Sequence, residues 1–301
     1  MRRMTILVVV LVLATSVTWA GEAKPFHVLL VNDDGVDAPG LEALAVVLHA
    51  DPAYRVTVVA PTDHQSGKGS ALTYTREIAV RPHGPVGGVK AWSVDATPAT
   101  TARIGLAFLL ADDPPDLVVS GINRGENVGR IAWYSGTVGA AREAVLAGST
   151  AVAFSLQLNW ADPQPDFEDA ARWAKPVVDA LRSQPLPLGV YLNVNIPKDP
   201  ASITGYRLCR QGLERPQVAG FDVKSEEDGV RYLKSRWAPA MGNGTGSDTT
   251  ELHRGWVTLT PLTLDATAYR AFPELTTLVD LQAPQEEEEM NVQRSTSNVQ
   301  H

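Results

Sequence analysis

Two adjacent carboxylates, Asp33 and Asp34, are the residues of this sequence whose type and position best suit chemistry. They follow the apolar run Val28–Val31 and precede Gly35, so they stand in the turn after the buried strand that this run predicts. Carboxylate oxygens in such a turn suit Mg²⁺ or Mn²⁺. The same residues would also suit a plain turn or a helix cap, and this stretch alone leaves both interpretations open.

A second candidate group opens a later helix that is rich in small residues. Ser135, Gly136 and Thr137 stand at its start, where hydroxyls and backbone N–H groups at a helix N-terminus can bind an anion such as phosphate. Simple N-capping by Ser135 or Thr137 is the alternative, and it also stays open.

The elements that must position these residues alternate between strands and helices. Apolar runs predict strands over residues 55–60, 71–80, 89–94, 117–119, 151–156 and 190–196. Helical spacing predicts helices over residues 40–49, from 98 to 110, from 135 onward, and over 166–183, where Pro176 predicts a kink or a break. This order indicates an α/β fold, a Rossmann-like, mostly parallel sheet with helices on both faces.

In such a sheet, the loops that follow the strands share one crevice at the carboxyl edge. Three of them carry candidate residues: the Asp33 turn, the loop 62–70 with Ser66, and the segment from Asn123 to Thr137. Two carboxylates, a hydroxyl and an amide form an all-oxygen metal site that leaves positions open for water and phosphate oxygens. The chemistry this set predicts is metal-assisted hydrolysis of a phosphate monoester.

Composition limits the other possibilities. The chain has 301 residues, of which 44% are hydrophobic, enough for one large globular domain. A net charge of −8 gives no basic surface for a nucleic-acid polymer, and a single cysteine excludes an intramolecular disulfide. We expect a single domain over residues 21–282, with its core at about 27–200, a β-rich arm and return at about 204–265, and a disordered acidic and polar tail over 283–301.

Residues 1–20 have the pattern of a secretory signal peptide. Arg2 and Arg3 precede the apolar run Thr5–Leu13, and small residues precede a cleavage point after Ala20. The run is short for a membrane span, so we expect cleavage and no stable membrane insertion, with an uncleaved anchor as the alternative. The expected location is periplasmic or secreted, or cytoplasmic if this interpretation of the N-terminus is wrong.

An ordered set of motifs resembles the SurE family of survival-protein nucleotidases and acid phosphatases. The set covers roughly residues 27–265, and it is the order of the motifs that makes it specific. The motifs are Val31-Asn-Asp-Asp-Gly-Val-Asp-Ala-Pro-Gly40, Val59-Ala-Pro61 with Ser66-Gly67, Val94-Asp-Ala-Thr-Pro98, Pro115-Asp-Leu-Val-Val-Ser-Gly-Ile-Asn123, Tyr134-Ser-Gly-Thr-Val-Gly-Ala-Ala141, Leu192-Asn-Val-Asn195, and Ser247-Asp248 with 255–262.

The resemblance implies a divalent-metal phosphatase that hydrolyses nucleoside 5′- and 3′-monophosphates. It also implies a homodimer or homotetramer formed through a C-terminal β-hairpin arm that is exchanged between subunits. Asp34 is assigned as the carboxylate nearest the attacking water, although the sequence does not rank it against Asp33. The implied metal ligands are Asp33, Asp34, Ser66 and Asn123, and the implied phosphate contacts are Asn127, Ser135, Gly136 and Thr137.

Departures from the family pattern leave the preferred base and sugar position open. The segment Ala96–Thr101 lacks the usual Asp-Cys pair, and Arg130 and Ile131 stand where the family often has acidic residues. A protein of another class, an exported nucleotide- or metal-binding protein without turnover, would also keep an anion site at the helix N-terminus. Metal-dependent turnover distinguishes the two.

Overall fold

The apolar run before Asp33 forms the centre of a nine-stranded sheet. In the computed structural model, which describes residues 24–158, 165–213, 218–238 and 244–275, β1 (Phe26–Val31) pairs in parallel with β2 (Tyr54–Pro61) and with β5 (Leu117–Arg124). The chain runs outward from β1 through β2 to β4 (Val89–Val94) and then returns to β5. The reversal between β1 and β5 is a topological switch point, where open α/β sheets bind ligands.

The remaining strands extend this sheet on both sides, in the order β3-β4-β2-β1-β5-β6-β7-β11-β8. Only β3 against β4 and β11 against β7 are antiparallel, so the predicted mostly parallel α/β sheet is confirmed. The strand β3 forms one edge and contains Pro82 and Pro85. These outer strands are β3 (Val80–Val86), β6 (Ala151–Leu156), β7 (Val190–Ile196), β8 (Gly205–Leu208) and β11 (Trp256–Thr263).

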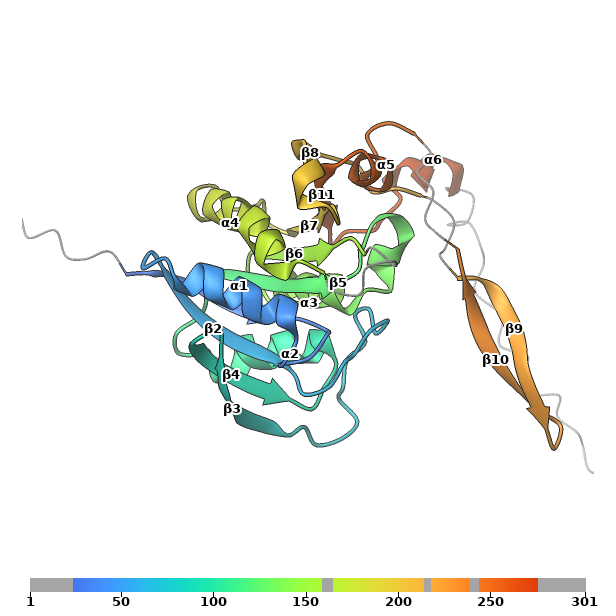
Figure 1. Ribbon diagram of the computed structural model, residues 1–301, viewed down its shortest axis with the longest axis horizontal. Coiled ribbons are helices and arrows are strands. Elements are labelled where there is room, and N and C mark those ends of the chain that lie inside the picture. Colours follow the sequence, from blue (N-terminus) through green and yellow to red (C-terminus); the bar gives the residue numbers. More distant parts are fainter. Residues whose placement is uncertain (1–23, 159–164, 214–217, 239–243, 276–301) are drawn as a thin grey trace, which may run out of the picture. The chain divides into compact units, whose positions relative to one another are not determined.

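Helices cover both faces of the sheet (Figure 1). As a result, the side chains of its central strand β1 are buried on both faces. Val28 and Leu30 of β1 pack in the hydrophobic cluster of α1 (Pro39–His49) and α4 (Phe167–Ser183). Leu29 and Val31 alternate with them and pack in the cluster of α2 (Pro98–Ile104) and α3 (Gly136–Leu146). This arrangement places the N-terminus of α3 over the end of β1.

Two expectations about individual elements need correction. Residues 71–79 form no strand; the Thr73 N–H donates to the Thr100 hydroxyl of α2, and Leu72 and Tyr74 are exposed. Of the kink or break predicted at Pro176, the break is wrong, because α4 continues through this residue. The short helix α5 (Asp248–His253) is capped by Ser247, whose hydroxyl accepts from the Thr250 N–H.

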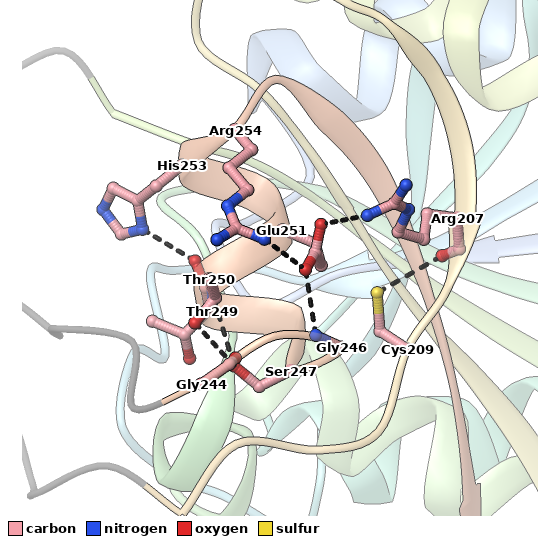
Figure 2. A network of polar contacts seen from close by, with 10 residues as sticks. All are labelled: Arg207, Cys209, Gly244, Gly246, Ser247, Thr249, Thr250, Glu251, His253 and Arg254. Atoms are coloured by element: carbon pink, nitrogen blue, oxygen red, sulfur yellow. Dashed lines mark hydrogen bonds and ion pairs between the residues drawn. The ribbon is translucent and has the colours of Figure 1, made fainter.

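The β-hairpin arm forms a separate two-stranded antiparallel sheet, β9 (Val218–Glu227) with β10 (Val230–Trp237). The family resemblance predicts such a hairpin, and the structure has it. Next along the chain, the buried carboxylate of Glu251 anchors α5, as Figure 2 shows. It accepts hydrogen bonds from Arg207 of β8, from Arg254 and from the Gly246 N–H.

The chain divides after Leu264, and α6 (Phe272–Leu275) belongs to the second unit, 265–301. The expected signal peptide and acidic tail lie outside the described residues, and the domain limits stay predictions. In the described part of the chain, no helix is both long and apolar enough to cross a membrane. Shorter helical turns lie at Gly105–Leu109, Gly129–Trp133, Pro200–Ser202 and Tyr269–Ala271.

Candidate functional site

Asp33 lies at the carboxyl end of β1, directly against the first turn of α3. Asp33 is only 3% exposed, and the Thr137 hydroxyl donates a hydrogen bond to its Oδ1. A Cβ at Gly136 would lie 2.8 Å from Asp33 Oδ2 and 2.7 Å from its Cβ, so only glycine permits this approach. The helix N-terminus that the sequence predicts as an anion site therefore faces a carboxylate of the chain itself.

Asp34 points to the other side of the turn, toward β5 and the loop 62–70. Its Oδ2 accepts from the Arg124 N–H at 3.0 Å, and its Oδ1 lies 3.3 Å from Nδ1 of the exposed His64. Its side chain, 13% exposed, borders a cavity of about 450 Å³. Asp34 thus combines a fixed orientation with access to solvent, which a group that handles a water molecule requires.

Burial makes both carboxyl groups reluctant to ionise. Burial, and then the neighbouring charge of Asp34, raise the pKa of Asp33 to about 7, against the opposing effect of the Thr137 hydrogen bond. Burial also raises the pKa of Asp34, although the Arg124 N–H and His64 act in the other direction. A bound cation would relieve this cost, because opposite charge nearby favours the ionised form.

The loop that carries Ser66 is hydrogen-bonded to the backbone of the turn after β1 and to the start of α3. The Gln65 N–H donates to the Asp33 carbonyl oxygen at 2.7 Å, and the Gly69 N–H donates to the Tyr134 carbonyl oxygen at 2.9 Å. At the end of the loop, Arg142 of α3 donates to the Ser70 hydroxyl at 2.7 Å. Ser66, which is itself exposed, is therefore held between the turn after β1 and the start of α3.

Asn123 and Asn127 come from the end of β5 and the loop after it. Asn123 donates through Nδ2 to the Gly125 carbonyl oxygen at 2.8 Å, which leaves its own amide oxygen as the possible metal donor. Asn127 is 4% exposed, and its Nδ2 donates to the Ser155 hydroxyl at 2.8 Å. These contacts bring the turn after β1 next to the end of β5, the loop 62–70 and the start of α3, where the predicted residues lie.

Sequence reasoning placed three supporting side chains in motifs of the family resemblance but assigned them no role. Asn193 and Asn195 of β7 both bond the backbone of Asn127, and the Asp248 carboxylate accepts from the Gly129 N–H at 3.1 Å and the Gly212 N–H at 2.8 Å. The available signal was the Asn-Val-Asn spacing, since residues i and i+2 of a strand share a face.

The donor set fits a hard divalent cation. In the ranges that the structure describes, no group of three or more His, Cys, Asp or Glu side chains could hold a metal ion. The predicted site does not need such a group, because its donors are two carboxylates, a hydroxyl and an amide oxygen. All-oxygen donors of this kind suit Mg²⁺ or Mn²⁺ better than zinc or copper.

A doubly wound sheet with paired carboxylates at its switch point defines the class of α/β proteins that bind ligands at the carboxyl edge of the sheet. Within that class, this chain belongs to the SurE family: the model for "Survival protein SurE" matches residues 28–217.

Curated relatives and a solved structure agree with this assignment. The "5'-nucleotidase SurE" of Desulfatibacillum aliphaticivorans is 38% identical over 244 residues, covering 81% of this chain and 94% of the relative. That of Anaeromyxobacter sp. (strain K) is 40% identical over 256 residues, covering 83% and 94%. The crystal structure of the SurE protein from Aquifex aeolicus is 33% identical, with a TM-score of 0.71, and it covers 84% of this chain and all of that one.

Proposed function

We propose that this protein is a divalent-metal-dependent phosphatase that hydrolyses nucleoside 5′- and 3′-monophosphates to nucleoside and phosphate. The observation that carries the proposal is the pair of carboxylates at the switch point: Asp33 is buried against the start of α3, and Asp34 borders the cavity. The names of the relatives support the nucleotide substrate.

The candidate residues would have three different roles: metal binding, proton acceptance and orientation of the phosphate. Asp33, Asp34, Ser66 and Asn123 would hold Mg²⁺ or Mn²⁺, which when bound polarises a phosphoryl oxygen and makes a water molecule more acidic. Asp34, the more accessible carboxylate, would accept the proton of the attacking water. Asn127, Ser135, Gly136 and Thr137 would orient the phosphate.

The first test is phosphate release from 5′-AMP and 3′-AMP by the full chain with Mn²⁺, with Mg²⁺ and with EDTA. We expect release only with a divalent cation, and about 10²- to 10⁴-fold less kcat for Asp34→Asn, since this range is typical for loss of a positioned acid or base. Asp112→Asn, which removes an exposed carboxylate, is the matched control. A folded protein that binds Mn²⁺ but releases no phosphate from any monoester would instead be a binding protein without turnover.

We also propose that copies of the chain form a dimer or tetramer through the arm. Exposed apolar side chains on the hairpin, Phe221, Val223, Val230, Tyr232 and Leu233, support this, because such patches mark interaction surfaces. A monomeric mass in solution would contradict it.

Export remains our proposal from residues 1–20, and N-terminal sequencing of the mature protein tests it.

A further inference from the structure

Two asparagines of β7 bond both backbone polar groups of Asn127, its N–H and its carbonyl oxygen. Asn195 Oδ1 accepts from the Asn127 N–H at 2.7 Å, and Asn193 Nδ2 donates to the Asn127 carbonyl oxygen at 2.8 Å. Both asparagines are fully buried, and they share one face of the strand. The backbone partners fix which amide atom of each residue makes the contact, because an N–H only donates and a carbonyl only accepts.

The side chain of Asn127 extends this contact toward the carboxylates. Its Nδ2 donates to Ser155 Oγ of β6 at 2.8 Å and lies 3.5 Å from Thr137 Oγ1. The Thr137 hydroxyl in turn donates to Asp33. A continuous set of buried polar contacts therefore leads from β7 to Asp33, and Asn127 lies in its middle.

Asn127 needs this support because it lies in an irregular loop. The segment between β5 and the helical turn at Gly129–Trp133 is neither strand nor helix. Gly125, its first residue, and Gly129, which begins the turn, have positive φ values of 123° and 55°. A buried backbone N–H and C=O require hydrogen-bond partners, and no strand supplies them here. The two asparagine side chains take the place of a neighbouring strand.

We infer that Asn193 and Asn195 are positioning residues that set the orientation of Asn127 toward the substrate phosphate. This inference rests on the proposed function, and it adds two residues that do not touch substrate. Their hydrogen-bond roles are opposite: Asn195 must accept, and Asn193 must donate.

This asymmetry provides a test with two matched variants. Asn195→Asp keeps the acceptor, and in the described part of the chain the lost Nδ2 has no partner. Asn193→Asp removes the donor and turns an oxygen toward the Asn127 carbonyl. Both variants add a carboxyl group to the same face two residues apart, so any effect of charge or burial is shared and the difference reports hydrogen-bond polarity.

We expect the KM for 5′-AMP and the inhibition constant of inorganic phosphate to be at least about 10-fold higher in Asn193→Asp than in Asn195→Asp, within the range known for groups that orient ligands. The Kd for Mn²⁺, measured by calorimetry, should change less than these two constants in both variants, because Asn193 and Asn195 bond the backbone of Asn127 and none of the proposed metal donors. Thr260→Val, a buried change on the neighbouring strand β11, should leave all three constants as in wild type.

Ser155→Ala gives a second test that removes only a hydroxyl, for the case in which an aspartate variant does not fold. It should raise the same two constants in the same direction, without changing the Mn²⁺ Kd. Equal constants for the two aspartate variants, or an effect of Ser155→Ala on Tm alone, would overturn the inference. A wild-type protein that releases no phosphate with Mn²⁺ would be a failure of the proposed function instead.

Discussion

Replacing Asp33 with asparagine is expected to stabilise the metal-free protein above pH 7 while removing its metal-dependent activity. The pKa of Asp33 is raised to about 7 by burial and by Asp34, so between about pH 4 and pH 7 the folded state holds a proton that the unfolded state has lost. Stability of the wild type therefore falls as pH rises through this window and stays low above it. Asparagine has the same shape and no charge.

The measurement is the Tm in EDTA from pH 5 to pH 8.5. The wild-type Tm should fall relative to that of Asp33→Asn by several degrees, given about 2–4 °C per kcal/mol for a protein of this size. Mn²⁺ should restore the Tm of the wild type only, since a ligand at 100 times its Kd adds about 2.7 kcal/mol. Phosphate release should fall more than about 10²-fold. A Tm difference that is the same at pH 5 and pH 8 would show that ionisation of Asp33 is not the cause.

Replacing Gly139 with alanine is expected to weaken metal binding by about 10- to 100-fold, the range for loss of groups that support metal ligands. Its Cβ would lie 1.9 Å from the Gly69 carbonyl oxygen, so the loop that carries Ser66 must move away from α3. In an exposed helix the same change would stabilise by about 1 kcal/mol, which makes a loss of function here diagnostic of the contact.

The test of Gly139→Ala is the Mn²⁺ Kd together with the KM for 5′-AMP. Gly84→Ala in β3 is the control, because its Cβ would meet no atom within 4 Å. An unchanged Mn²⁺ Kd in Gly139→Ala would mean that the position of the Ser66 loop does not matter for the metal.

Predictions from the sequence succeeded where a local pattern decides the structure. The apolar run before Asp33 is a buried central strand, and the spacing of Leu41, Leu44 and Leu48 corresponds to the buried face of α1. The strand predicted over 71–80 is wrong except at Val80, the first residue of β3, because a local alternation does not decide which partners the backbone finds. Thr73 instead bonds Thr100 at the start of α2.

The edge of the sheet where the candidate residues lie was predictable, but their contacts were not. The βα order was enough to bring Asp33, Ser66 and Asn123 to one edge of the sheet. The contact between Thr137 and Asp33 was not predictable, because it depends on how closely α3 approaches β1, and that distance is set by Gly136 in three dimensions. The role of Asn193 was missed for the same reason, since its partner is 66 residues away in the sequence.

The prolines of the edge strand have a consequence for how the protein behaves at high concentration. Pro82 and Pro85 remove two backbone N–H groups from β3, and the opposite edge, β8, has only four residues. Neither edge offers the long row of free donors and acceptors that would recruit a strand from another molecule. The nine-stranded sheet is thus protected against edge-to-edge aggregation at both ends.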